Sequence, residues 1–342
     1  MKDIRDYSLL AHNTFGIDAK CRRFLEYSSV EEAQQMVAEL TPDDQPLLIL
    51  GGGSNLLLTG DYEGTVIHSA IKGIKVLDNE KLHSSDSVFL SCGSGEVFDD
   101  VVAYAVEHGY HGAENLSIIP GEVGASAVQN IGAYGVEAKD IIYKVEAVEI
   151  ATGKVVVFDN QDCQYSYRQS RFKHEWKDKY LVTHVIYRLS KHFVPDLDYG
   201  NIRTSLAAKK IGNPTAQQLR DVIIEIRNAK LPDPKVQGNA GSFFMNPIVQ
   251  KAKYEELAAL YPGMPHYTID AEHEKIPAGW MIDQCGWKGQ SLGRAGVHDK
   301  QALVLVNRGG ATGEEIVNLC ETIRKDVKQK FGIDIHPEVN VK

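Results

Sequence analysis

One stretch, Leu47-Leu-Ile-Leu-Gly-Gly-Gly-Ser-Asn-Leu-Leu57, joins a short apolar run to a glycine triplet. The apolar run predicts a buried strand, and glycines after a strand let backbone N–H groups approach a phosphate closely. The turn is not a dinucleotide fingerprint, because G-x-G-x-x-G would need glycine where the chain has Leu56. A Walker A loop is also excluded, because no Gly-Lys-Ser/Thr follows. The triplet alone leaves a tight turn and a ligand cradle both open.

A second glycine-rich stretch covers residues 119–135 and reads Ile-Pro-Gly-Glu-Val-Gly-Ala-Ser-Ala-Val-Gln-Asn-Ile-Gly-Ala-Tyr-Gly. Such a density of small residues predicts either backbone packed directly against a flat ligand or a loop with many positive-φ residues. Its candidate hydrogen-bonding side chains are Ser126, Gln129 and Asn130. The two interpretations are equally open on this stretch alone.

Apolar periodicity predicts that helices and strands alternate through the first half of the chain, which is typical of α/β or α+β layers. Capping boxes precede the predicted helices at Ser29, Thr215 and Thr312. Helices are expected over 31–40, 97–108, 215–231 and 312–331; strands over 46–50, 66–67, 88–92 and 180–189; and a hairpin over 141–158.

Two further patterns concern the second half of the chain. Leu231-Pro-Asp-Pro234 would stop a helix abruptly and predicts a domain boundary. Near the C-terminus, Ile333, Ile335 and Val339 alternate like a strand, so the tail that carries Glu338 is expected to be docked rather than solvated.

Composition excludes several classes of function. The 342 residues predict roughly two domains. Lys and Arg number 37 against 46 Asp and Glu, a net charge of −9 that disfavours nucleic acid and anionic membranes as partners. No apolar run approaches the roughly 18 residues of a membrane span, and Asp3, Arg5 and Asp6 argue against a signal peptide. Five widely spaced cysteines form neither a disulfide framework nor a zinc site, so a cytoplasmic protein is expected.

The charged and nucleophilic candidates are weak when each is taken alone. Arg168, Arg171, Lys230 and Lys235 either clamp a carboxylate or phosphate or are simply solvated. Ser242 is not in a G-x-S-x-G elbow. Metal catalysis is disfavoured, because the sequence has no H-E-x-x-H motif and no pair of histidines with a carboxylate at the spacing of a metal site. The residues themselves predict a soluble α/β enzyme that binds a flat, phosphorylated cofactor.

Ordered motifs spread over nearly the whole chain resemble the UDP-N-acetylenolpyruvoylglucosamine reductase (MurB) family, in its longer, Escherichia-like class. The motifs are Asn13-Thr-Phe-Gly16, Gly51-Gly-Gly-Ser-Asn55, Ile119-Pro-Gly121, Gln129-Asn-Ile-Gly-Ala-Tyr-Gly135, Tyr167-Arg168, Lys230-Leu-Pro-Asp-Pro-Lys235, Gly238-Asn-Ala-Gly-Ser-Phe-Phe244, Ala278-Gly-Trp-Met-Ile-Asp-Gln284, Val297-His298, Gln301-Ala-Leu303 and Pro337-Glu-Val339.

The resemblance implies an α+β fold: two FAD-binding subdomains of the vanillyl-alcohol-oxidase (PCMH) type, then an α/β substrate domain that includes the active-site tail. The expected bounds are 1–70, 71–228 and 229–342. FAD would be bound non-covalently, without a metal. The implied FAD contacts are Gly51, Gly52, Gly53, Ser54, Asn55, Leu56, Gly121, Gly124, Ala125, Ser126, Asn130, Ile131, Gly132 and Arg227.

The implied reaction uses NADPH to reduce UDP-N-acetylglucosamine enolpyruvate to UDP-N-acetylmuramate in peptidoglycan precursor synthesis, by a cytoplasmic monomer. Arg168 would stabilise the enolate, Glu338 would lie beside it, and Ser242 would give C2 its proton. Tyr199 would close over the substrate. The other implied substrate contacts are Tyr134, Tyr167, Lys230, Asn246, Tyr267, Lys288 and Gln301.

Three alternatives remain beside this reading. One is a flavin oxidase or dehydrogenase of the same fold that acts on an alcohol or lactone, since a fold does not fix a function. Another is a non-catalytic nucleotide-sugar sensor, although Arg168, Ser242 and Glu338 are all present. The last is a Rossmann NAD dehydrogenase, against which Leu56 counts.

Overall fold

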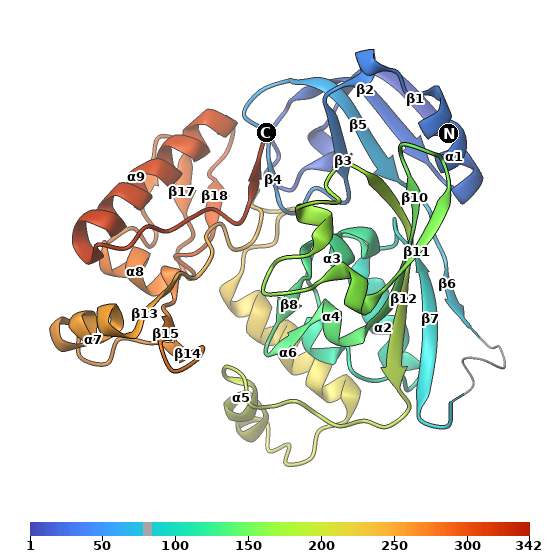
Figure 1. Cartoon of the computed structure of the whole chain (residues 1–342). Helices are drawn as coiled ribbons and strands as arrows, with labels where there is room; N and C mark the ends of the chain where they lie inside the picture. The colour runs from blue at the N-terminus through green and yellow to red at the C-terminus, as the bar shows by residue number, and fades with distance from the viewer. Residues whose placement is uncertain (78–83) are drawn as a thin grey trace. The chain divides into compact units, whose positions relative to one another are not determined.

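The computed structural model describes residues 1–77 and 84–342, which form two compact units (Figure 1). Unit 1 comprises Met1–Tyr7, Cys21–Gly52 and Glu63–Ala229. Unit 2 comprises Ser8–Lys20, Gly53–Tyr62 and Lys230–Lys342. Unit 2 therefore takes two short N-terminal segments as well as the C-terminal third of the chain. The division into 1–70, 71–228 and 229–342 stays a prediction.

The first sheet of unit 1 contains the strand that leads into the glycine triplet. Its strand order is β1 (Lys2–Ser8), β2 (Lys20–Tyr27), β5 (Tyr62–Ser69) and β3 (Leu47–Leu50). Strand β3 pairs with β5 in parallel, with Leu50 opposite His68. Helix α1 (Val30–Glu39) begins as predicted, because the Ser29 hydroxyl accepts a hydrogen bond from the backbone N–H of Glu32 at 3.1 Å.

The second sheet of unit 1 is antiparallel. Its strand order is β11 (Val155–Asp159), β10 (Ile142–Glu149), β12 (Tyr180–Ser190), β7 (Ser87–Gly93) and β6 (Ile74–Val76). The predicted hairpin is confirmed as β10 and β11, with Val148 opposite Val155. One apolar cluster joins Met36 of α1 and Ile67 of the first sheet to Val148 and Leu181 of the second. The two sheets of this unit therefore share a core.

Some helices of unit 1 pack on the second sheet, and others follow along the chain toward the end of the unit. They are α2 (Phe98–Glu107), α3 (Val123–Gln129), α4 (Ala138–Ile141), α5 (Ile202–Ala208) and α6 (Ala216–Lys230). Helices α3 and α4 pack against β12. Helix α6 is tied to α2, because the Arg220 guanidinium donates to both oxygens of Asp99 at 2.7 and 2.9 Å.

Neither sequence interpretation of residues 119–135 foresaw helix α3, whereas positive φ angles do occur around it, at Gly121, Asn130, Tyr134 and Gly135. Its small residues serve helix packing: a Cβ on Gly124 would lie only 2.9 Å from the Cβ of Ser94. Ala127 is completely buried in the core of the second sheet. Positive φ angles occur just outside the helix, at Gly121 (121°) and Asn130 (50°).

Unit 2 is built from small sheets and helices, with α9 packed on α8, β17 and β18. Its helices are α7 (Lys251–Leu260), α8 (Ala278–Gln284) and α9 (Gly313–Phe331). One sheet has the order β13 (Ile248–Gln250), β15 (His273–Lys275), β14 (Tyr267–Thr268), and another the order β16 (Ser291–Leu292), β17 (Ala295–Val297), β18 (Leu305–Asn307).

The C-terminal tail is docked within unit 2, as the sequence predicts. Strand β19 (Asn340–Val341) pairs in parallel with β4 (Leu56–Leu57), directly after the glycine triplet. Upstream, the backbone N–H of Glu338 donates to the carbonyl of Phe243 at 2.8 Å. The regular strand covers only 340–341, and before it Pro337 forms a single isolated bridge with Phe244.

Among the described residues, none of the helices combines the length and apolar character needed to cross a bilayer.

The cap of α9 makes a direct test of this unit. The Thr312 hydroxyl accepts from Glu315 N at 3.2 Å, and the Glu315 carboxylate accepts from Thr312 N at 2.8 Å. We expect Thr312→Ala to lower the free energy of unfolding by about 1 kcal/mol, measured by urea denaturation. Thr322→Ala, inside the same helix, is the matched control. Equal losses in both variants would contradict the cap.

Candidate functional site

The glycine triplet is divided between the two units. Gly51 and Gly52 follow β3 in unit 1 and lie against the start of α3. A Cβ on Gly51 would stand 3.2 Å from the Cβ of Ala125, and one on Gly52 would stand 3.4 Å from the Cα of Gly121. Two glycine turns that the sequence predicts as FAD contacts are thus brought together in unit 1.

Gly53 has a different role in unit 2. Its φ is +64°, and a Cβ there would lie 1.9 Å from the carbonyl oxygen of His12, which no side chain tolerates. The next residues join the tail: Asn55 Nδ2 donates to the Glu338 carbonyl at 3.4 Å, and the Asn55 carbonyl accepts from Asn340 N at 3.1 Å. Ser54 lies between Gly53 and Asn55, and Leu56 begins β4.

Ser126 and Asn130, both predicted FAD contacts, use their side chains inside unit 1. Buried Ser126 donates to the Val123 carbonyl and shares a 2.7 Å hydrogen bond with the Tyr187 hydroxyl. Asn130 is also buried, donates to the Ser166 carbonyl at 2.9 Å and accepts from Lys139 N at 3.0 Å. Asn130 therefore binds together segments that are distant in sequence.

Arg168 is anchored by the same loop. Its Nη2 donates to the Gly132 carbonyl at 2.7 Å, and its Nη1 donates to the Asn130 carbonyl at 3.4 Å. Its guanidinium carbon stands 5.3 Å from the ring centre of Tyr167, which is a cation–π contact. Its backbone has φ of 57°, a conformation that costs energy in a non-glycine residue and is common at functional sites. Ile131 donates its backbone N–H to the Ser126 carbonyl.

Two predicted substrate tyrosines meet in unit 1. The rings of Tyr134 and Tyr199 contact edge-to-face, with centres 6.3 Å apart and planes at 89°. Tyr199 is 40% exposed, whereas burial raises the pKa of Tyr134. Asn115 holds this turn by donating to the Tyr134 carbonyl at 2.9 Å.

Arg227 of α6 is a half-buried cation in the same unit. Burial lowers the pKa of its guanidinium, and Tyr134 and Asp99 oppose that shift. Within 1–77 and 84–342, its Nε is inaccessible to solvent and has no hydrogen-bond partner. A buried donor without an acceptor is costly, which makes this nitrogen a candidate ligand contact.

Unit 2 brings two of the predicted catalytic residues together. Residues 243–245 run beside 336–338: Phe244 and Pro337 form a bridge, and Met245 N donates to the His336 carbonyl at 2.9 Å. Ser242, which is exposed, directly precedes the first segment, and half-buried Glu338 ends the second. Serine and carboxylate therefore come from adjacent backbones.

The other predicted substrate residues of unit 2 fall into separate groups. Asn246 Oδ1 accepts from Ala278 N at 2.9 Å, and a Cβ on Gly279 would lie 3.1 Å from Gln301 Oε1, so both amides reach the start of α8. The Lys275 ammonium lies over the Tyr267 ring, 5.4 Å from the ring centre.

Two predicted substrate lysines of unit 2 are exposed. Lys288 pairs with Asp283 at 2.6 Å. Lys230 is the last residue of α6 and the first residue of the C-terminal segment of unit 2.

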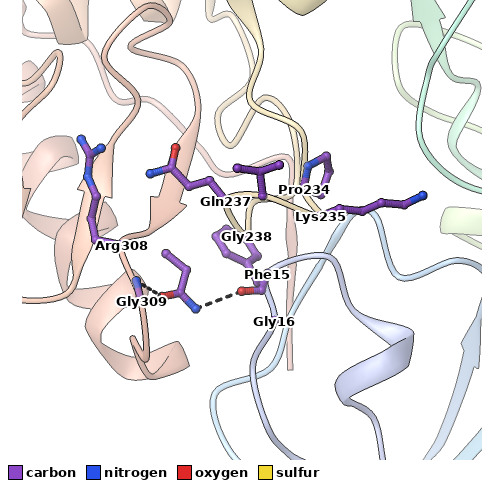
Figure 2. Close-up of a pocket in the computed structure, with 10 residues that line it drawn as sticks. Phe15, Gly16, Pro234, Lys235, Gln237, Gly238, Arg308 and Gly309 are labelled. Carbon is purple, nitrogen blue, oxygen red and sulfur yellow. Dashed lines mark hydrogen bonds between the residues drawn. The ribbon is translucent and has the colours of Figure 1, made fainter.

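An open cavity of about 550 Å³ lies elsewhere in unit 2 (Figure 2). Asn307 connects parts of its lining: it donates to the Phe15 carbonyl at 3.0 Å and accepts from Gly309 N at 2.9 Å. Its lining includes Lys235 and Arg308 but none of the residues predicted as catalytic, cofactor or substrate contacts. We therefore assign the candidate site to the predicted residues and not to this cavity.

Sequence reasoning missed one cluster altogether. His68 of β5 lies between the carboxylates of Glu26 and Glu122 in unit 1. No motif links these residues, which are separated by 42 and 54 positions from His68. The pairing of β2 with β5 brings Glu26 to His68, and the turn before α3 brings Glu122.

Comparisons with known proteins agree with the predicted class. The model of an FAD binding domain matches residues 22–159. The model of the UDP-N-acetylenolpyruvoylglucosamine reductase C-terminal domain matches residues 233–342.

Relatives match along almost the full chain. A UDP-N-acetylenolpyruvoylglucosamine reductase from Bacteroides fragilis is 56% identical over 334 residues, 98% of each chain. One from Porphyromonas gingivalis is 47% identical over 338 residues, again 98% of each. The crystal structure of the Thermus caldophilus reductase has a TM-score of 0.66 at 21% identity, covers 99% of this chain and 98% of that one, and so shares the fold.

These matches define the chain first as an FAD-dependent oxidoreductase. It belongs to the UDP-N-acetylenolpyruvoylglucosamine reductase family. The predicted family, fold class and flavin cofactor are confirmed.

The residues present fit an FAD. Gly51 and Gly52 pack closely against Gly121 and Ala125, so two glycine turns meet, and glycines of this kind occur where a ligand backbone contact is close. The buried Arg227 Nε is a donor that still needs an acceptor. The fit rests on both features, although the contact made by each residue stays a prediction.

Gly53 gives a test of the triplet. We expect Gly53→Ala to lower the free energy of unfolding by more than about 2 kcal/mol, because its Cβ would displace the His12 backbone. Gly60→Ala, where a Cβ meets open space, is the matched control and should change stability by less than about 0.5 kcal/mol in urea denaturation. Similar losses in both would refute the steric argument.

Proposed function

We propose that this protein reduces UDP-N-acetylglucosamine enolpyruvate to UDP-N-acetylmuramate at the expense of NADPH. Family membership supports the reaction, since close relatives across nearly the whole chain carry the name of this reductase. When bound, FAD supplies the redox chemistry, taking a hydride from NADPH and giving it to the enolpyruvyl ether. The remaining work falls to the side chains.

FAD is held, in this proposal, by the turns at Gly51–Gly52 and Gly121, by the loop Asn130–Gly132 and by Arg227. Bare backbone N–H groups suit the pyrophosphate. The Arg227 guanidinium provides a fixed cation whose Nε is already desolvated. Gly124 and Ser126 contribute by fixing the position of α3, because their contacts are within the protein. Gly53, Ser54, Asn55 and Leu56 also stay proposed FAD contacts, as the family resemblance implies.

Arg168 stabilises the negative charge that develops when hydride reaches C3 of the enolpyruvyl group. Two backbone carbonyls and the Tyr167 ring orient its guanidinium before substrate arrives. Preorganised positive charge of this kind needs little rearrangement in the transition state, which is why it lowers the barrier.

Ser242 donates the proton that C2 requires, and Glu338 has an orienting or proton-sharing role in the same step. The observation that carries the proposal is the pairing of 243–245 with 336–338, which sets a serine and a carboxylate on adjacent backbones. A hydroxyl is a weak acid, but an enolate carbon is a strong base, so a well-placed hydroxyl suffices.

The nucleotide end of the substrate is assigned to Lys230, Asn246, Tyr267, Lys288 and Gln301. Among residues 1–77 and 84–342, Asn246 uses its side-chain oxygen at α8, which leaves its NH₂ available to a ligand. Tyr134 and Tyr199 flank the substrate from unit 1, where their rings already touch. We also propose that the protein works as a cytoplasmic monomer, without nucleic acid or membrane partners, in wall synthesis that supports cell shape and division.

A steady-state assay tests the reaction itself. NADPH oxidation should depend on added UDP-N-acetylglucosamine enolpyruvate, and mass spectrometry should show a product heavier by two hydrogens. Oxidation that proceeds with oxygen alone, with no reduced product, would instead favour a flavin oxidase.

Replacing the proposed proton donor separates the two half-reactions. We expect Ser242→Ala to leave flavin reduction by NADPH unchanged and to slow flavin reoxidation by the substrate at least about 10²-fold, measured by anaerobic stopped-flow absorbance. Ser291→Ala, another exposed serine of unit 2, should slow neither step. A similar loss in both half-reactions of Ser242→Ala would make Ser242 a structural residue.

Removing one hydroxyl tests the role of Tyr199. We expect Tyr199→Phe to weaken substrate binding about three- to tenfold, the worth of one hydrogen bond, with a smaller effect on the chemical step. The control is Tyr110→Phe. The Tyr110 ring is stacked with the His108 ring, and the two ring centres are 6.0 Å apart. Unchanged substrate affinity in Tyr199→Phe would remove Tyr199 from the substrate site.

A further inference from the structure

A buried ionic cluster lies beneath the glycine turns of unit 1. His68 is only 8% exposed. Its Nδ1 stands 2.9 Å from Glu26 Oε2, and its Nε2 stands 3.2 and 3.3 Å from the two oxygens of Glu122. The second Glu26 oxygen pairs with Lys2 of β1. The imidazole therefore bridges two carboxylates.

The cluster favours a positively charged His68. Burial by itself opposes the charge, but the hydrogen bonds and negative charges of Glu122 and Glu26 outweigh it, so the pKa of His68 is raised. Burial would likewise raise the pKa of Glu26, yet Lys2 and His68 hold that pKa below its ordinary value. Two carboxylates thus face two cations, and the set is neutral as a whole.

Glu122 connects this cluster to the glycine turns. It directly follows Gly121 and precedes α3. A Cβ on Gly51 would lie 3.5 Å from Glu122 Oε2, and one on Gly52 would lie 3.6 Å from the Glu122 Cγ. A carboxylate therefore abuts both turns, where an uncompensated negative charge would repel a bound pyrophosphate.

We propose that His68 is a positioning residue for FAD, which holds and neutralises Glu122 so that the turns at Gly51–Gly52 and Gly121 accept the pyrophosphate. This inference rests on the proposed function, which places FAD at those turns. His68 acts through Glu122 and does not touch the cofactor itself. A polar residue that only packed the sheet would need no partner next to the turns.

The test is the dissociation constant of FAD, measured by flavin fluorescence on rebinding to protein stripped of flavin. We expect His68→Gln to weaken binding about tenfold, because it leaves the Glu122 charge unneutralised. Glu122→Gln should bind FAD as tightly as the parent protein or more tightly. The double variant should regain the affinity of Glu122→Gln to within about twofold.

The matched control is His192→Gln. His192 also pairs with a carboxylate in unit 1, Asp86 at 3.1 Å, but both side chains are exposed. It should leave FAD affinity unchanged. A double variant as weak as His68→Gln would overturn the proposal, since it would show that His68 matters for packing and not for charge.

Other outcomes separate this inference from the function on which it rests. If Gly52→Val weakens FAD binding but His68→Gln does not, the role of His68 is wrong and the placement of FAD stands. If the parent protein binds FAD but Gly52→Val and His68→Gln both bind it normally, FAD does not lie at these turns and the inference fails with that placement. A parent protein that takes up no FAD overturns both.

If His68→Gln does not fold, the pH dependence of FAD binding to the parent protein still tests the proposal. As the pH rises through the raised pKa of His68, the imidazolium charge is lost while Glu26 and Glu122 stay ionised, so FAD affinity of the parent protein should fall. Among the described residues, the charged and titratable groups around His68 include Glu26, Glu122 and Lys2, with Tyr27 facing Glu122 and Tyr7 facing Lys2. Glu122→Gln should lose most of this pH dependence, and an equal fall in both proteins would contradict the proposal.

Discussion

Backbone hydrogen bonds of the C-terminal tail determine the arrangement of unit 2. Glu338 N donates to the Phe243 carbonyl, Asn340 N to the Asn55 carbonyl, and Lys342 N to the Leu57 carbonyl. Two segments that are far apart in the sequence, residue 243 and residues 55–57, are therefore ordered by one short stretch of extended chain. These backbone bonds place the segment that follows Ser242 next to the segment that carries Glu338.

Unit 1 uses a comparable device around Asn130. Its left-handed backbone ends α3, and its amide ties the following loop to residue 166, two positions before Arg168. The carbonyls of Asn130 and Gly132 then receive the Arg168 guanidinium. The conformational cost of holding residues 130 and 168 at positive φ is met by these contacts, and the result is a cation fixed in place before any substrate binds.

The sequence predicted those elements whose signals are local. The capping boxes at Thr215 and Thr312 formed as expected. At Ser29 only the hydroxyl half formed, because the Glu32 carboxylate binds Ser28 and the N-terminus instead. The predicted hairpin is β10 and β11. Helix α3 was not foreseen, because its glycine and alanines are explained only by contacts with Ser94 and the second sheet, which lie elsewhere in the chain. The sequence also did not show that residues 8–20 and 53–62 belong to unit 2, because backbone pairing leaves no signature in the residue types.

The candidate site shows the same division. Residue types alone led to a flat phosphorylated cofactor, and the particular residues came from the family resemblance. Neither route pointed to His68, because a buried histidine between two glutamates is visible only once β2, β5 and the Gly121 turn are folded together. The sequence also did not show that the Ser126 hydroxyl and the Asn246 side-chain carbonyl make hydrogen bonds within the protein.

The most direct measurement is an anaerobic absorbance titration of the purified protein. One equivalent of NADPH should bleach the bound flavin, and UDP-N-acetylglucosamine enolpyruvate should then restore the oxidised spectrum with formation of the lactyl ether. A flavin that bleaches but is reoxidised only by oxygen would contradict the proposed reductase activity.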